Sequence, residues 1–159
     1  MIRVVRDEGG GMAPMVHSVE IDRRREDVFA YVTDPTRFPE WQDAVVRASP
    51  QGSGPLQQGS RISLTRRMGK REQTMTSELT EYSPPESYAF RVVDGPVRAI
   101  GKGRFEPLGE GDRTRFTFEL DFEGHGLGKL LVPLFVRRQA AKELPESHAN
   151  LKKQLESGA

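Results

Sequence analysis

Residues 126–157, GLGKLLVPLFVRRQAAKELPESHANLKKQLES, are the most periodic stretch of the sequence, and they decide its fold. Apolar residues and one histidine recur there mostly at steps of three and four, which places them on one stripe of a helix. The stripe contains Leu127, Leu130, Leu131, Leu134, Ala141, Leu144, His148, Leu151 and Leu155. Charged residues fill the intervening positions and suit a solvated face. The stretch therefore predicts a helix of about 28 residues, roughly 42 Å long.

One proline falls well inside this helix. Pro145 cannot donate a hydrogen bond to the Ala141 carbonyl, and its ring crowds that carbonyl. We therefore expect a kink near residues 141–144. A helix that bends part-way along its length can follow a curved sheet, and we expect the strands ahead of it to wrap around it.

Two short helices are predicted near the start of the chain, after a strand at Met15–Ile21. Asp22 is positioned to cap the first helix, whose apolar face contains Val28, Phe29 and Val32. The second begins at Asp34-Pro35, a capping residue followed by a proline suited to the first helical position, and it contains Phe38 and Trp41.

Six further strands are predicted between these helices and the long one. They are Val45–Ala48, Ser60–Met68, Arg71–Tyr82, Ser87–Val93, Val97–Leu108 and Arg113–Glu123. Short turns such as Gly69-Lys70 join most of them, which indicates an antiparallel meander. Residues 1–14 are predicted to be a flexible N-terminal segment, the predicted flexible lead-in, and residues 15–157 are predicted to form a single domain.

The composition excludes several classes of protein. The 24 basic and 23 acidic residues give a net charge of +1, so there is no general attraction to nucleic acid. There is no cysteine, which excludes disulfides and cysteine nucleophiles and fits the cytoplasm, where we expect the protein to act. The first residues are too charged for a secretory signal, and no apolar run is long enough to span a bilayer.

Three segments of the sequence resemble a known family. They are SVEIDRRREDVFAYVTDPTRFPEW at residues 18–41, TSELTEYSPPESYAFRV at 76–92 and GKLLVPLFVRRQAAKELPESHANLKKQLE at 128–156. Their order is similar to that of the polyketide cyclase/dehydrase and lipid-transport family, in the START-like (SRPBCC, Bet v 1-like) superfamily. The resemblance implies an α+β helix-grip fold, in which a curved antiparallel sheet and the long C-terminal helix enclose a cavity. It also implies an apolar or amphipathic ligand such as a lipid, sterol or polyketide. It supplies no catalytic motif and no cofactor.

Small residues on inward-facing strand positions agree with a cavity. Ser77, Ala99, Gly101 and Gly103 either let the helix pack closely or leave empty volume, although a filled core is the competing interpretation. Trp41 is either a lid over the cavity or a structural anchor. The candidate ligand contacts are Phe38, Trp41, Met75, Ser77, Phe90, Gly101, Gly103, Phe105, Phe116, Phe118, Leu131 and Leu134.

Few polar residues are candidates for chemistry. His148 lies on the helix stripe, where it is either an acid or base in the cavity or a structural histidine. Gln73 and Ser77 face inward and need a partner, which is a ligand, a water or the backbone. Tyr31 and Tyr88 are candidate hydroxyl donors at the rim. The three histidines have no metal-binding spacing, so we expect no metal.

Three functions are compatible with these features. The favoured one is a binding module for an apolar small molecule, because no nucleophile–base set can be assembled. The second is a cyclase or dehydratase that uses His148, Tyr31, Gln73 and Ser77 for acid–base work. The third is a protein-interaction domain, which predicts a filled core and a large exposed apolar patch. We expect no nucleic-acid partner, and a homodimer is left open.

Overall fold

The structure is a computed structural model that describes residues 3–4, 14–95, 97–123 and 128–158, with side chains for 14–95, 97–123 and 136–158. The predicted flexible lead-in falls mostly on residues 1–2 and 5–13, which lie outside this set. Within the described part, residues 3–4 pair with the strand that begins at Met15.

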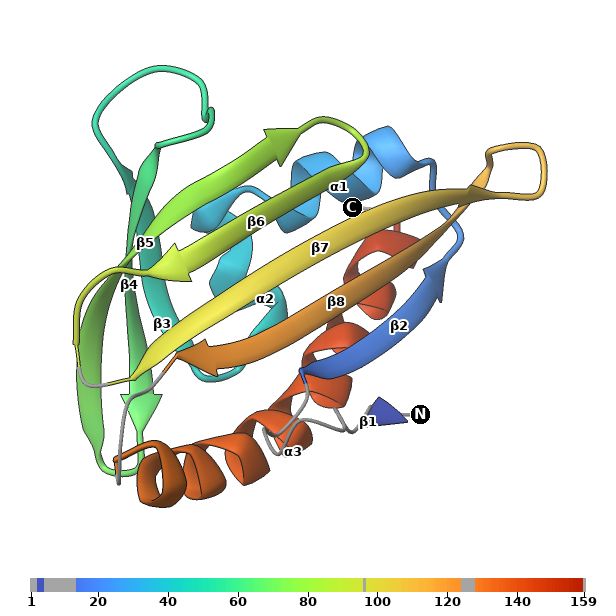
Figure 1. The fold of residues 1–159 in the computed structure, drawn as a ribbon. Helices are drawn as coiled ribbons and strands as arrows, with labels where there is room; N and C mark the ends of the chain where they lie inside the picture. Colours follow the sequence, from blue (N-terminus) through green and yellow to red (C-terminus); the bar gives the residue numbers. More distant parts are fainter. Residues whose placement is uncertain (1–2, 5–13, 96, 124–127, 159) are drawn as a thin grey trace.

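One antiparallel sheet contains all the described strands, in the order β1-β2-β8-β7-β6-β5-β4-β3 (Figure 1). The strands are β1 (Arg3–Val4), β2 (Met15–Ile21), β3 (Val45–Gln51), β4 (Arg61–Met68), β5 (Arg71–Ser83), β6 (Ser87–Val92), β7 (Arg98–Leu108) and β8 (Arg113–Glu123). From β3 to β8 each strand pairs with the next in the chain, so the predicted meander is confirmed. The predicted strands match the observed ones to within a few residues.

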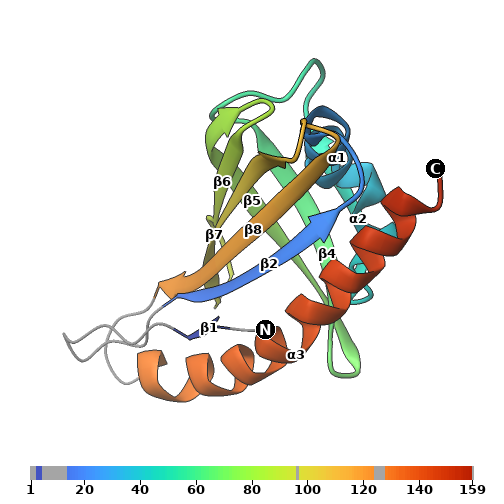
Figure 2. The ribbon, with the colours of Figure 1, turned by 90° about the vertical axis from the view of Figure 1, so that its right-hand side faces the viewer.

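The long helix α3 (Gly128–Glu156) lies along the concave face of the curved sheet (Figures 1 and 2). This arrangement is the predicted helix-grip fold. The helix is continuous through Pro145, and Figure 2 shows its axis changing direction part-way along. We expected a bend because a proline in a helix interior removes one backbone hydrogen bond and crowds the preceding turn.

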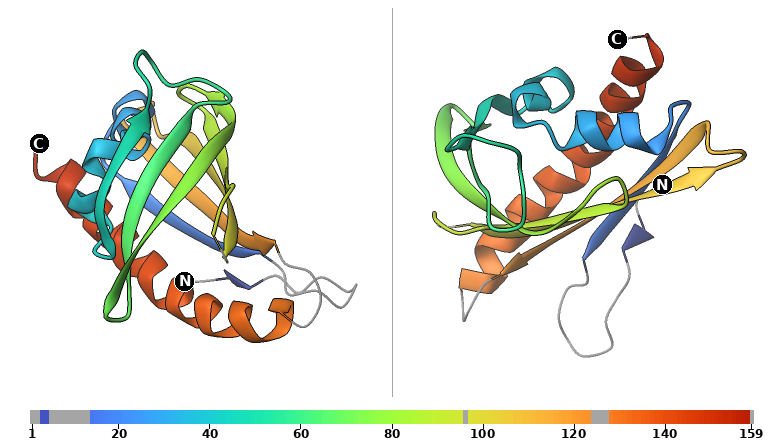
Figure 3. Two further views of the ribbon diagram at one scale, coloured as in Figure 1. Left: turned by 90° about the vertical axis from the view of Figure 1, so that its left-hand side faces the viewer. Right: turned by 90° about the horizontal axis from the view of Figure 1, so that it is seen from above.

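The short helices α1 (Arg25–Val32) and α2 (Phe38–Trp41) lie beside the C-terminal half of α3 (Figure 3). A 3₁₀ turn at Pro35–Arg37 connects them, and Asp34 caps it as predicted by accepting a hydrogen bond from the Thr36 amide at 3.0 Å. The predicted cap at Asp22 is wrong, because α1 begins after Arg24 and receives no side-chain cap. The Asp22 amide instead donates to Glu156 Oε1 of α3 at 3.0 Å.

The core is densest at the end of the sheet that carries α1. The inward side chains of β2, β7 and β8 meet α1 and the last turns of α3 there, and they are almost completely buried. The most deeply buried side chains of this closed end are Ile21, Val28, Val32, Phe105, Thr114, Phe116 and Leu151. Burial of apolar surface on this scale is the main stabilising contribution to a domain of this size.

Candidate functional site

Most inward-facing side chains at the opposite end of the sheet are only half-buried, although Met15 and Val92, which also face inward there, are each 4% exposed. Strand alternation and the register of β8 with β7 place these side chains on the same concave face as the closed end. We call this set the half-buried face; it consists of Leu64, Gln73, Met75, Ser77, Phe90, Phe118, Leu120 and Phe122. The concave side of the sheet therefore changes along its length from a filled core to a surface that the described chain does not fully cover.

Aromatic rings cover the two glycines of β7. The Phe90 ring lies over Gly101 and the Tyr88 ring lies over Gly103, so closely that a Cβ at either position would clash with the ring. We expected these glycines to leave empty volume or admit the helix. Instead they admit rings from the neighbouring strand β6, because only a residue without a side chain leaves that space.

Three inward-facing rings lie nearly parallel to their neighbours, and we call this set the aromatic floor; it consists of Tyr88, Phe90 and Phe118. The Tyr88 and Phe90 rings are inclined by 11° with centroids 6.4 Å apart, and the Phe90 and Phe118 rings by 21° at 6.2 Å. Tyr88 is buried, whereas Phe90 and Phe118 are half-buried. The floor therefore extends from the closed end into the half-buried face, where two of its rings lie.

Two histidines meet at the boundary between the two ends. His17 on β2 and His148 on α3 are joined by a hydrogen bond of 2.5 Å between their Nδ1 atoms. His148 is also 5.2 Å from the ring of Phe116 and 6.4 Å from that of Phe118, measured between centroids. Burial lowers the pKa of both imidazoles, and that of His148 falls to about 3 because the nearby His17 adds to the effect. Both rings are therefore neutral at pH 7.

An ion pair ties α3 to the sheet at the edge of the half-buried face. Arg66 of β4 lies opposite Gln73 of β5, and its Nη2 is 2.5 Å from Glu143 Oε2 on α3. The Arg66 Nε is buried and has no hydrogen-bond partner within the described chain. On the other side of α3, Arg137 pairs with Asp121 of β8 at 3.0 Å. The two pairs hold the middle of α3 between β4 and β8.

We expect Glu143→Gln to lower the free energy of unfolding by about 1 kcal/mol, because it leaves the charge of the partly buried Arg66 without a carboxylate. The matched control is Glu78→Gln, whose partner Arg61 is more than half exposed, and it should cost less than about 0.5 kcal/mol. Urea unfolding curves of both variants test this. Equal losses would show that the pair across α3 contributes no more than a surface pair.

The candidate acid–base residues do not form one site. His148 is buried beside His17, and Gln73 and Ser77 are half-buried on β5. Tyr31 is buried and donates a hydrogen bond of 2.9 Å to Glu40, away from the rim where we expected it. Burial, and then this carboxylate, raise the pKa of Tyr31 to about 12, which makes its hydroxyl a poor acid.

The candidate ligand contacts divide between the two ends of the sheet. Met75, Ser77, Phe90 and Phe118 belong to the half-buried face, whereas Phe105 and Phe116 belong to the closed end. Phe38 and Trp41 pack edge to face with centroids 6.3 Å apart, next to the closed end. Trp41 is buried, in the position of a structural anchor, and its Nε1 has no partner among the described residues. The side chains of Leu131 and Leu134 lie outside the described set.

Sequence reasoning missed His17 and Arg66. His17 lies at the same two-residue spacing as the apolar residues Met15, Val19 and Ile21. The strand pattern therefore indicates that its side chain faces inward with theirs. Arg66 follows Ile62 and Leu64 at the same two-residue spacing. Neither was assigned a functional role from the sequence, since charged and polar residues usually lie at the surface.

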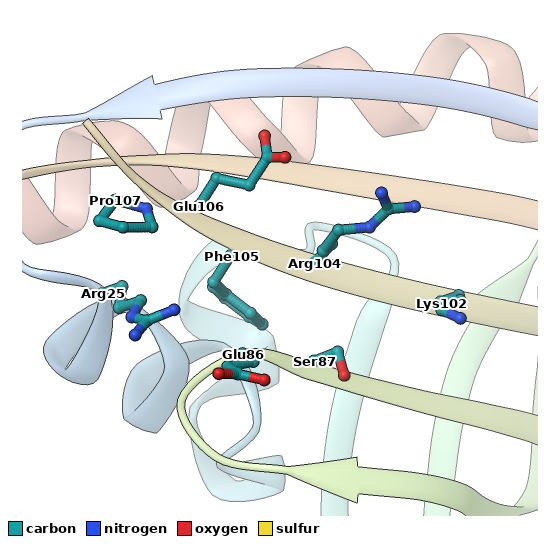
Figure 4. Close-up of a pocket in the computed structure, with 8 residues that line it drawn as sticks. All are labelled: Arg25, Glu86, Ser87, Lys102, Arg104, Phe105, Glu106 and Pro107. Carbon is teal, nitrogen blue, oxygen red and sulfur yellow. The ribbon is translucent and has the colours of Figure 1, made fainter.

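A surface hollow of about 300 Å³ lies away from the concave face, between the start of α1, the β5–β6 turn and the end of β7 (Figure 4). Its lining is mostly charged and consists of Arg25, Glu86, Ser87, Lys102, Arg104, Phe105, Glu106 and Pro107. Lys102 and Glu106 also make ion pairs with Glu81 and Arg115 on the outer face of the sheet. A hollow of this character does not suit an apolar ligand.

The described residues form neither a metal-binding cluster nor a membrane-spanning helix. No three or more histidine, aspartate or glutamate side chains gather there in an arrangement that could hold a metal ion. None of the described helices combines the length and the apolar character needed to cross a bilayer.

Comparison with known proteins identifies similar chains. A family model described as polyketide cyclase / dehydrase and lipid transport matches residues 12–156. A search of curated proteins by sequence found no match. Solved structures with the same fold include a START superfamily protein from Mycobacterium smegmatis, at 18% identity and a TM-score of 0.71, covering 91% of this chain and 97% of that one.

Two other similar structures are named as aromatase/cyclases. The Zhui aromatase/cyclase from Streptomyces sp. R1128 has a TM-score of 0.65 and 16% identity, over 97% of this chain and 96% of that one. The di-domain ARO/CYC BexL from the BE-7585A biosynthetic pathway has a TM-score of 0.72 and 18% identity over 91% of this chain. The match spans only 47% of BexL. At these identities the likeness concerns the fold.

Proposed function

Because the chain belongs to the polyketide cyclase/dehydrase and lipid-transport family, we propose that it binds an apolar or amphipathic small molecule between its sheet and α3. The observation that carries the proposal is the change in burial along the concave face, from the closed end to the half-buried face. Large apolar side chains on the inner face of a sheet are normally buried. Their partial exposure here supports space that a ligand fills.

The chemistry of the half-buried face supports the same class of ligand. Phe90, Phe118 and Met75 offer apolar, polarisable contact area, and the nearby Ser77 and Gln73 offer a few polar groups. Small-molecule pockets have this composition, mostly apolar with a small number of placed polar groups. Leu131 and Leu134 stay proposed contacts from α3, on the basis of their helical spacing.

The described surface gives little support to a protein-interaction domain. Its only large apolar side chains that count as exposed are Met68 and Ile100, which lie on different strands and are each 36% exposed. An apolar docking surface usually needs a contiguous patch of several hundred Å². Two such residues supply much less than this.

A cyclase or dehydratase is the second candidate, and the buried histidine pair favours it. Neutral imidazoles beside an apolar face are suited to move a proton to or from a bound carbonyl compound. Tyr31 is removed from the acid–base set by its hydrogen bond to Glu40. A bound molecule whose mass changes with time would reveal such a reaction in the binding experiment that follows.

We expect 2-naphthol, a small apolar probe, to bind the wild-type protein and to bind Phe118→Asp at least about tenfold more weakly. A carboxylate in the half-buried face would have to lose its water when the probe binds, and that desolvation is costly. Probe fluorescence gives the affinity. Native mass spectrometry of the freshly purified protein shows in addition whether a molecule co-purifies and leaves on unfolding.

The control is Ile100→Asp, which makes a similar change on the exposed outer face of β7 and should leave the affinity unchanged. Phe118→Ala serves as a milder variant if the aspartate disturbs folding. Absence of any co-purifying molecule and of naphthol binding by the wild-type protein would overturn the proposal. So would equal affinities of the Phe118 and Ile100 variants.

A further inference from the structure

The His17–His148 pair is the most deeply buried polar contact between the sheet and α3. His17 is 9% exposed and His148 is 1% exposed, and the two residues are 131 positions apart in the chain. Their ring centroids are 4.6 Å apart. Within the described chain, each imidazole has only the other as a hydrogen-bond partner.

The contact between the two Nδ1 atoms dictates the positions of the protons. A hydrogen bond between two nitrogens needs one N–H and one bare nitrogen. One ring therefore carries its proton on Nδ1 and has a bare Nε2, and the other carries its proton on Nε2. The pair as a whole is neutral and presents one donor and one acceptor, both at Nε2 atoms that no described protein group occupies.

The pair lies at the level of the sheet where the half-buried face begins. His17 lies directly opposite Phe118, which is half-buried, whereas the next inward pair toward the closed end, Val19 and Phe116, packs into the core. Two charged groups of α3 near this level are engaged elsewhere, Glu143 with Arg66 and Lys152 with Glu156. The only hydrogen bond of the pair to a described residue joins the two Nδ1 atoms, so a water or a ligand group is expected on each Nε2.

We propose that the His17–His148 pair is the polar anchor of the ligand site, and that it binds an uncharged hydroxyl or carbonyl group of the ligand through Nε2. A hydroxyl can donate to the bare nitrogen, and a hydroxyl or a carbonyl can accept from the N–H. A carboxylate would bring an unpaired charge to a neutral, apolar site, which is strongly unfavourable. The ligand is therefore an apolar alcohol, phenol or ketone and not a fatty acid anion. This inference rests on the proposed function.

The first experiment tests the pair without a ligand. Long-range ¹H–¹⁵N correlation spectra of the labelled protein at pH 7.5 report which nitrogen of each imidazole carries a proton. We expect His17 and His148 to have opposite tautomers, and His17→Phe to change the spectrum of His148. Two rings in the same tautomer, or either ring with both nitrogens protonated, would overturn the proposal.

The second experiment compares three probes of one shape: 2-naphthol, 2-naphthoate and naphthalene. At pH 7.5 we expect the wild-type protein to bind 2-naphthol at least about tenfold more tightly than either of the others. His148→Phe keeps an aromatic ring of similar size, and it should reduce this preference to less than about threefold; His17→Phe should do the same. The control is Ile21→Val in the fully buried closed end, which should keep the preference.

The outcomes separate the anchor from the pocket. If the three probes bind equally, or if the preference for 2-naphthol survives both histidine variants, the anchor is overturned and the apolar pocket stands. If the wild-type protein binds none of the three, the anchor and the proposed function are both overturned.

Discussion

Lowering the pH from 7 to 5 should reduce the free energy of unfolding by about 2 kcal/mol through His148 alone. The pKa of this imidazole falls from its ordinary value of 6.5 to about 3 in the folded protein, because it is buried beside His17 and two phenylalanine rings. At pH values between the two pKa values, 6.5 and about 3, the imidazole binds a proton in the unfolded chain but not in the folded chain. The folded state is therefore at full stability above pH 7, and it loses stability as the pH falls below 6.5.

Urea unfolding at pH 5, 6 and 7 and constant ionic strength measures this effect. In His148→Phe the slope of stability against pH should become clearly smaller. A residual slope of the same sign is expected from His17, whose pKa is also lowered by burial. A variant with the same slope as the wild-type protein would show that His148 does not carry the pH dependence.

Gly103→Ala should lower the free energy of unfolding by about 2 kcal/mol, the typical result of inserting a methyl group into a filled core. The new Cβ would clash with the Tyr88 ring, which is buried and packed against Phe105 and Phe90. Because the ring is buried against these neighbours, moving it disturbs the packing of the core. In a double-mutant cycle, Tyr88→Leu should remove most of the penalty, because the two changes act on one contact.

Gly101→Ala is the matched comparison. It clashes in the same way with Phe90 and also with Phe118, but both rings belong to the half-buried face and can move toward the open side. We expect a loss of about 1 kcal/mol or less, accompanied by weaker binding of 2-naphthol because the displaced rings fill the site. A larger loss for Gly101→Ala than for Gly103→Ala would contradict the assignment of the closed and half-buried ends.

The strands, the long helix and the faces they bury could all be read from local patterns. Alternation along residues 113–123 predicted which side chains of β8 face inward, and the spacing along residues 144–155 predicted the buried stripe of α3. These patterns are reliable because successive side chains in a strand point to opposite faces of the sheet. In a helix, residues three or four positions apart lie on the same face. The family resemblance also rests on local sequence segments, those at residues 18–41, 76–92 and 128–156.

Only the tertiary structure decided which inward-facing residues meet. His17 pairs with His148, Arg66 with Glu143, and the rings of Phe90 and Tyr88 fill the space above two glycines. Periodicity states the face on which a residue lies, but not the residue opposite it, since that depends on strand register and on the path of a bent helix across the sheet. The elements are therefore encoded locally, whereas the histidine pair and the half-buried face arise from the way α3 packs against the sheet.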